Sequence, residues 1–421
     1  MANLTERELP YLTSELPGTG GRIRQRAEDF RVEEVPLYTP CGEGTHVYFR
    51  VTKTGVPTPA AVARIARHMG AKSTDIGYAG LKDAHAVTTQ MMSLEHANEE
   101  RLARYRDPRV RVEVVGRHGN KLRPGHLAGN RFVLRIRGAG EAQLPAAQAV
   151  LDVLKRRGAP NYFGPQRFGA RGDTADLGRA LVKGELDEFV AILLGRPKED
   201  DPPDCRAARD AFDNGFLARA LDRWPRHHAD RRRALAAYRK RRDPARAAAA
   251  VDKRMRRLYV SAFQSGIFNA VLARRIDTLD RVLDGDLAQK TDTGGVFEVE
   301  DARAEQPRAD RFEISPTGPV PGYRSPLASG EPGRIEAEAL AAEGVTDADF
   351  RRAGALKVKG TRRALRFRPV DAGLTAGRDD HGEYLQVVFT APSGCYATVL
   401  LREVMKNAAG PERNPPAAGD V

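Results

Sequence analysis

The stretch "HVYFRVTKTGVPTPAAVARIARHMG", from His46 to Gly70, changes its periodicity half-way along. Val47, Phe49 and Val51 alternate with other residues, which is the pattern of a half-buried strand. From Thr58 onward the apolar residues recur at helical spacing, and we expect Thr58 to be the N-cap of that helix. A strand that passes directly into a helix predicts mixed α and β structure.

The rest of the chain divides into parts with different patterns of apolar residues and different composition. Strand patterns follow at "VTTQMMSLE", "RVRVEVVGRH" and "NRFVLRIRG", and an amphipathic helix at "PAAQAVLDVLKRRG". From about Arg171 the patterns become helical and rich in alanine and arginine. The stretch "ISPTGPVPGYRSPLASGEPG" is expected to form turns, and strand patterns return after Gly360. This order predicts an α+β protein in which a largely helical domain interrupts a sheet domain.

These changes of texture set the expected boundaries. We expect the sheet domain to comprise residues 1–160 and 359–408, and the helical insertion to comprise residues 161–358. The tail, residues 409–421, has the composition of a disordered segment. A length of 421 residues agrees with about two to three domains.

The composition is that of a globular protein, with 41% hydrophobic and 30% charged residues. No apolar run approaches the roughly 18 residues that a membrane span needs, and the N-terminus lacks the features of a secretory signal. We therefore expect a cytoplasmic protein without membrane contact. The three cysteines lie far apart in the sequence, which predicts neither a disulfide framework nor a zinc site.

The net charge of +13 favours a polyanionic partner. The segment between Pro225 and Arg257 contains thirteen lysines and arginines but three aspartates. Four of the basic residues are consecutive: Arg239, Lys240, Arg241 and Arg242. Two interpretations of this run stay open. It is either a phosphate-binding surface or a solvated, arginine-rich helical face.

One segment, "GYAGLKDAHAVTTQ" from Gly77 to Gln90, places a single aspartate, Asp83, before a strand-like run. Gly77 and Gly80 permit a tight turn, and a turn between strands would hold Asp83 on a rigid rim, which suits a catalytic group. The alternative, which the residues alone favour, is a turn aspartate that caps its own backbone. The sequence contains no GxxxxGK[ST], GxSxG or HExxH motif, and no spacing that predicts a metal site.

Eight segments in order resemble the TruD family of tRNA pseudouridine synthases. The resemblance runs from about Gly18 to Met405 and rests on "EDFRVEE", "GEGTHVYF", "AGLKDAHAVTTQ", "GNRF", "NYFGPQRFG", "SAFQSGIFN", "SPTGP" and "PSGCYAT". It implies a pseudouridine synthase catalytic domain with a mixed, mainly antiparallel sheet, interrupted by an inserted, mostly helical TRUD domain. It also implies isomerisation of uridine at position 13 of certain tRNAs, by extrusion of the target base and without any cofactor.

The resemblance assigns roles to particular residues. Asp83 falls on the family's catalytic aspartate, as nucleophile or base, and Arg24 on a basic residue close to that carboxylate, where many relatives have lysine. Phe132 falls on an aromatic residue of the active site, with core packing as the alternative. The amide of Asn130 or Gln90 would reach the uracil edge. Lys82 would either contact a phosphate or point into solvent.

Two rival functions stay open. The same chemistry could serve another RNA site, or the chain could be an RNA-binding protein without activity. A glycoside hydrolase would need a second carboxylate, for which Glu33 or Glu34 are the candidates. We expect tRNA as the partner, no obligatory protein partner, and a monomer.

Overall fold

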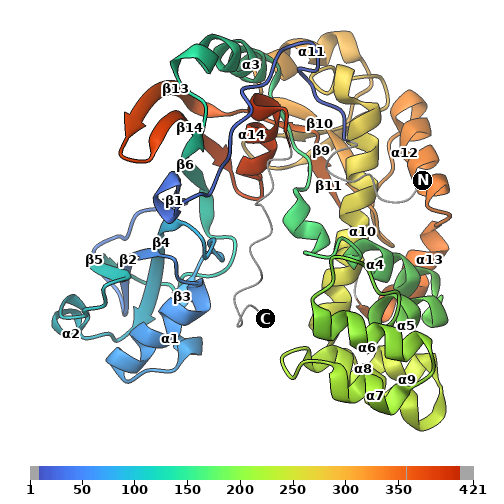
Figure 1. Cartoon of the computed structure of the whole chain (residues 1–421). Coiled ribbons are helices and arrows are strands. Elements are labelled where there is room, and N and C mark those ends of the chain that lie inside the picture. The colour runs from blue at the N-terminus through green and yellow to red at the C-terminus, as the bar shows by residue number, and fades with distance from the viewer. Residues whose placement is uncertain (1–8, 357, 408–421) are drawn as a thin grey trace. The chain divides into compact units, whose positions relative to one another are not determined.

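A computed structural model describes residues 9–356 and 358–407. By its internal contacts the chain divides into two compact units. Among the described residues, the first comprises Leu12–Ala159 and residues 367–407 and is called the sheet unit; the second comprises residues 9–11 and Pro160–Arg366 and is called the helical unit (Figure 1). No helix in the described ranges is both long enough and apolar enough to cross a membrane. The predicted disordered tail lies outside the described residues.

The sheet unit is built on one mixed sheet in the strand order β13-β14-β6-β1-β4-β2-β5, with β3 also paired to β4. Only the β1–β4 pair is parallel among the described pairs of this sheet, which confirms the predicted mixed, mainly antiparallel sheet. Its strands are β1 (Phe30–Pro36), β2 (His46–Thr54), β3 (Gly77–Tyr78), β4 (Val87–Glu95), β5 (Val110–His118), β6 (Leu127–Arg137), β13 (Val370–Asp379) and β14 (Gly382–Pro392). Its helices are α1 (Thr58–Met69), α2 (Glu99–Ala103), α3 (Leu144–Arg157) and α14 (Ala397–Met405).

The predicted strand and helix that follow each other at 46–70 are confirmed as β2 and α1. Val47, Phe49 and Val51 are fully buried, and they share one hydrophobic core with Val62 and Ile65 of α1. The two periodicities bring apolar side chains from one face of the strand and one face of the helix to the same core.

The expected N-cap at Thr58 is wrong. Helix α1 begins at Thr58 itself, its N-cap is Pro57, and no side chain caps it. The Thr58 hydroxyl instead accepts a hydrogen bond from the backbone N–H of Lys82 and donates one to Gln90 Oε1, each at 3.0 Å. Thr58 therefore bonds to residues that are distant in the sequence, and it does not cap its own helix.

The helical unit is organised around α10 (Lys253–Arg274), which contacts α4, α12 and strand β10 (Figure 1). The chain leaves the sheet unit through β7 (Ala159–Pro160) and returns through β12 (Arg366–Phe367). The other helices are α4 (Thr174–Lys183), α5 (Leu186–Leu194), α6 (Pro203–Asp213), α7 (Leu217–Arg223), α8 (Ala229–Arg241), α9 (Pro244–Ala250), α11 (Ala302–Asp310), α12 (Gly330–Ala342) and α13 (Asp347–Arg352). A second sheet has the order β11-β10-β8-β9, formed by β8 (Leu287–Lys290), β9 (Val296–Glu298), β10 (Ile314–Val320) and β11 (Thr361–Ala364).

Strand β10 corrects the expectation of turns in the proline-rich stretch after Glu313. Its first half, up to Pro316, pairs with β8, and its second half, from Thr317, pairs with β11. Each half of β10 therefore pairs with a neighbouring strand on one side. Prolines, which have no N–H to donate to a neighbouring strand, can be accommodated where the strand is not paired. Because β11 belongs to this sheet, the helical unit extends to Arg366 and not to residue 358.

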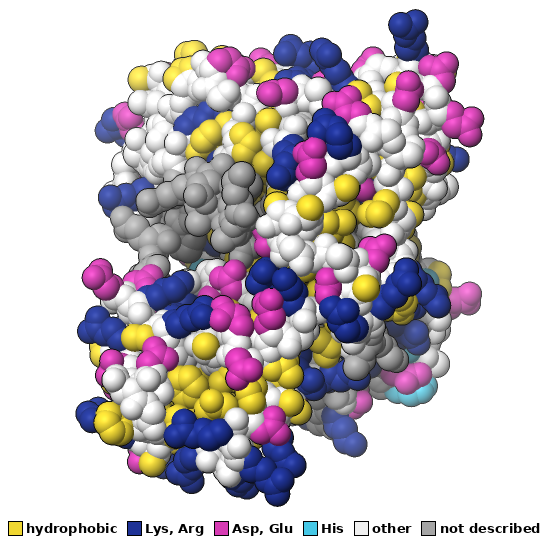
Figure 2. Space-filling view, turned by 90° about the vertical axis from the view of Figure 1, so that its right-hand side faces the viewer, with side chains coloured by type: hydrophobic (Ala, Val, Ile, Leu, Met, Phe, Trp, Pro, Cys, Tyr) yellow, Lys and Arg dark blue, Asp and Glu magenta, His cyan; other side chains and the backbone are white. Residues whose placement is uncertain are grey.

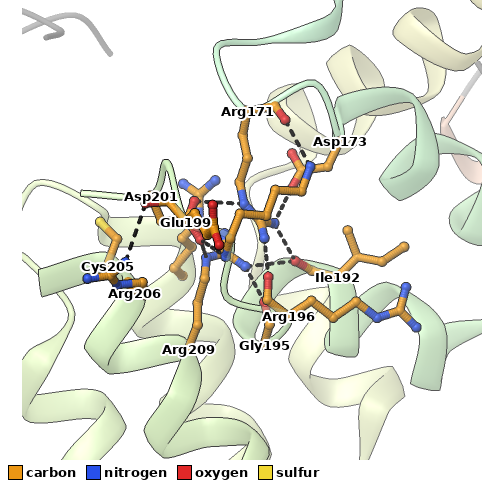
Figure 3. A network of polar contacts seen from close by, with 12 residues as sticks. Arg171, Asp173, Ile192, Gly195, Arg196, Glu199, Asp201, Cys205, Arg206 and Arg209 are labelled. Carbon is orange, nitrogen blue, oxygen red and sulfur yellow. Dashed lines mark hydrogen bonds and ion pairs between the residues drawn. The ribbon is translucent and has the colours of Figure 1, made fainter. Parts of the chain in front are cut away.

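Arginine side chains form hydrogen bonds and ion pairs where the chain passes from α5 to α6 (Figure 3). The guanidinium of Arg209 is buried and donates from Nη1 to the carbonyls of Ile192, at 3.0 Å, and Gly195, at 2.5 Å. Arg171 bonds Asp201 at 2.9 Å and also pairs with Asp173. Burial lowers the pKa of Arg209 to about 10. Part of the arginine content therefore caps helix ends and is not available to a ligand.

Candidate active site

Asp83 lies in the loop between β3 and β4, at the surface of the sheet unit. Its carboxylate Oδ2 accepts a hydrogen bond of 2.8 Å from Nη2 of Arg24, and the two side chains are 29% and 10% exposed. The pair joins residues far apart in sequence, and it is the partnership that the family resemblance implied. The contact is a charge-assisted hydrogen bond.

Arg24 is held in place by its backbone and by an aromatic ring. Its φ of 59° lies in the left-handed region, which is uncommon for residues other than glycine. Its guanidinium carbon lies 4.3 Å from the centroid of the Phe30 ring, in a cation–π contact. A strained backbone conformation persists only where the surroundings enforce it, and such residues cluster at functional sites.

Lys53 of β2 donates hydrogen bonds to the main chain of the loop that carries Asp83. Its side chain is fully buried, and Nζ donates to the carbonyl oxygens of Asp83, at 2.8 Å, and Lys82, at 3.3 Å. Burial lowers the pKa of the Lys53 ammonium from its ordinary value to about 8; the charge of Asp83 opposes that shift and Lys82 adds to it. Lys53 therefore anchors the loop of Asp83 through its backbone and adds a second positive charge near that residue.

Thr58 and Gln90 fix the loop just before Asp83. The Thr58 hydroxyl holds the N–H of Lys82, and Gln90 Nε2 donates to the carbonyl of Gly80 at 3.0 Å. Both side chains are buried. Because both ends of the Gln90 amide are engaged within the protein, its position favours support of the loop, and its expected contact with uracil stays a prediction.

Lys82 points neither into solvent nor toward a position open to a phosphate, in contrast to both expectations. Its side chain is buried, with Nζ 2.9 Å from Oε2 of Glu34 in an ion pair and 2.6 Å from Oδ1 of Asn130. A buried ammonium needs an opposite charge nearby, and Glu34 supplies it. Glu34 also accepts from the N–H of Met91, so it is engaged within the protein and is not placed as the second carboxylate of a glycosidase.

The strand register places these groups on one face of the sheet. Glu34 is opposite Asn130, and Phe132 is opposite Phe389. Directly opposite residues share a face, as do residues two apart in one strand. Phe132 is buried and stacks on Phe389, with ring centroids 5.1 Å apart. Its contacts here are those of core packing, and its contact with the target base stays a prediction.

Sequence reasoning missed Lys53, Thr58 and the structural role of Glu34. Two of them left a signal in the strand periodicity. Lys53 occupies the next inward position after Val51 in β2, and Glu34 the next after Val32 in β1. A charged residue in an inward register indicates a buried, paired charge. The hydroxyl of Thr58 left no such signal.

The basic run of the helical unit divides into two parts. Arg232 of α8 caps α7 by donating to the carbonyls of Leu221 and Trp224, at 2.6 and 2.7 Å. The consecutive residues Arg239, Lys240, Arg241 and Arg242 are exposed at the C-terminal end of α8, where positive charge also complements the helix dipole. Figure 2 shows dark blue basic and magenta acidic side chains interspersed over the face in view. Among the described residues, no group of three His, Cys, Asp or Glu side chains is placed to hold a metal ion.

Comparisons with known proteins match this chain to one family. The family model of tRNA pseudouridine synthase D (TruD) matches residues 7–404. A tRNA pseudouridine synthase D of Geobacter sulfurreducens is 45% identical over 402 residues, covering 95% of this chain and 98% of the relative. One from Anaeromyxobacter dehalogenans is 41% identical, with 95% and 97% covered. A solved structure from Methanosarcina mazei that carries the same description has a TM-score of 0.83 and 28% identity, and covers 95% of this chain and 96% of its own.

The fold of this chain is thus shared with RNA-modifying isomerases. The chain belongs to the TruD family of tRNA pseudouridine synthases.

Proposed function

We propose that this protein isomerises uridine to pseudouridine in tRNA, at position 13, with Asp83 as the catalytic carboxylate. The observation that carries the proposal is the ion pair between Asp83 and Arg24. The family resemblance of the motif around Asp83 supports the catalytic role, and the position of the uridine is what that resemblance implies.

The chemistry needs one ionised carboxylate. The bond between uracil N1 and ribose C1′ breaks, the base turns, C5 bonds to C1′, and the proton of C5 is lost while N1 gains one. Nothing is oxidised or reduced, so the reaction as a whole is an isomerisation. Asp83 either attacks C1′ as a nucleophile or removes a sugar proton, and the ion pair with Arg24 orients its carboxylate for either role.

The substrate must bring the uridine to Asp83. A uridine stacked in folded RNA has to be extruded, at a cost of a few kcal/mol, and contacts with the RNA backbone offset that cost. We assign the consecutive basic residues at the end of α8 to such contacts with tRNA phosphates. That the protein works in the cytoplasm, as a monomer, stays a prediction.

The test is the release of tritium from tRNA labelled at C5 of uridine. We expect wild type to release it and Asp83→Asn to release none, because an amide can neither attack C1′ nor accept the proton. Asp152→Asn, which removes an exposed carboxylate from α3, is the matched control and should behave as wild type. Turnover by Asp83→Asn would show that another group performs the reaction.

A further inference from the structure

Leu81 is the most exposed of the large hydrophobic side chains in the described part of the chain, at 68%. It lies two residues before Asp83. Single exposed leucines are normal on protein surfaces, so the exposure alone does not indicate a function. The surroundings of Leu81 make it unusual.

The backbone on both sides of Leu81 is fixed by buried groups. The carbonyl of Gly80 accepts a hydrogen bond from Gln90, and the N–H of Lys82 donates one to Thr58, both at 3.0 Å. The Lys82 carbonyl is also held by Lys53. A fixed backbone that presents an apolar side chain to solvent is a pre-organised contact, since little conformational entropy is left to lose on binding.

We propose that Leu81 contacts the substrate: its side chain packs against the face of the RNA base that neighbours the target uridine, after the target has left the stack. The inference rests on the proposed function. When one base is extruded, its neighbour loses a stacking partner and exposes an apolar face to water. Covering that face with leucine recovers part of the lost stabilisation, as apolar side chains do when they insert between base steps.

The geometry supports this occupant. Two residues of chain span at most about 7 Å, so Leu81 stays close to any base that reaches Asp83. A protein partner is a poor alternative, because stable protein interfaces bury about 800 Å² on each side and a single leucine offers far less. Every base has an apolar face, so the contact tolerates different neighbours in different tRNAs.

The experiment is a single-turnover measurement of tritium release at saturating enzyme, on intact tRNA and on two tRNAs with an abasic site immediately 5′ or 3′ of the target uridine. On intact tRNA we expect Leu81→Ala to react five- to thirty-fold more slowly than wild type, about 1–2 kcal/mol. Leu81→Met should stay within threefold of wild type. Leu327→Ala, which truncates another exposed leucine in the helical unit, is the matched control and should react at the wild-type rate.

The abasic substrates identify the contact. On one of them the difference between wild type and Leu81→Ala should disappear, because the base against which Leu81 packs has been removed. A Leu81→Ala rate within twofold of wild type on intact tRNA would overturn the inference, as would an equal loss on all three substrates. Wild type that releases no tritium from any of the three would overturn the proposed function, and this inference with it.

Discussion

Replacement of Lys53 by methionine tests how the loop of Asp83 is held. Methionine has a similar length and suits a buried site, but it removes both the charge and the hydrogen bonds from Nζ to the carbonyls of Asp83 and Lys82. The substituted residue cannot touch a substrate at the surface, since Lys53 is fully buried. Any effect on turnover must therefore act through the loop that carries Leu81 and Asp83.

The effects on stability nearly cancel. Lowering the pKa of Lys53 from 10.5 to about 8 costs the folded state about 3 kcal/mol at neutral pH, which methionine removes. Two buried carbonyls then lose a donor, at about 1–3 kcal/mol each. We expect the free energy of unfolding at pH 7 to change by no more than about 3 kcal/mol. The rate should fall much further, on the order of 100-fold in kcat, because a displacement of about 1 Å at a catalytic group has that effect.

The pH dependence distinguishes the effect of the Lys53 charge from the effect of its side-chain packing. In wild type, kcat/KM should decline above about pH 8, as Lys53 loses its proton, and Lys53→Met should lack this decline. The folded pKa lies below the unfolded one, so the unfolded state binds more protons between pH 8 and 10.5. The free energy of unfolding of wild type should therefore rise with pH across that window, relative to that of the variant.

Tritium release between pH 6.5 and 9.5 and urea unfolding at pH 7.5 and 9.5 measure both effects. Lys155→Met, at an exposed position of α3, is the control and should keep the wild-type pH profile. Retention of the decline near pH 8 in Lys53→Met would assign it to another group. More than half of the wild-type kcat in that variant would show that the loop does not need the anchor.

Three further predictions concern the other charged groups. Arg24→Lys should retain much of the activity and Arg24→Ala should lose most of it, whereas equal activity in all three proteins would mean that Arg24 is not the partner of Asp83. Because φ of Arg24 is 59°, Arg24→Gly should be about 1 kcal/mol more stable than Arg24→Ala in urea unfolding, and equal stabilities would argue against strain. Replacing the four basic residues from Arg239 to Arg242 by glutamate should weaken tRNA binding and flatten its dependence on salt, by up to about 0.9 in the log–log slope for each phosphate that the protein no longer neutralises. An unchanged slope would show that this basic run is a solvated helix end that does not bind tRNA phosphates.

The fold was predictable where burial follows a local period, and the site was not. Alternation correctly placed Val51 on the buried face of β2, but the next inward residue is a lysine, whose usual preference for the surface hides its burial. Thr58 looked like a cap because capping is local, whereas its real partners lie in a loop and a strand that only the tertiary fold brings near. The pairing of Arg24 with Asp83 has no spacing rule, so only the family resemblance indicated it.

The exposure of the charged groups agrees with the extrusion of the target base that we propose. The exposed fraction of the side chain rises from 0% at Lys53 and 1% at Glu34 to 6% at Lys82, 10% at Arg24 and 29% at Asp83. The cations are thus less exposed than the carboxylate of Asp83, which is the group most accessible to a substrate. If Asp83 is the catalytic carboxylate, as we propose, the uridine must leave its stacked helix for C1′ to come within reach of it. One accessible carboxylate backed by buried cations therefore agrees with extrusion of the uridine as a step of the proposed reaction.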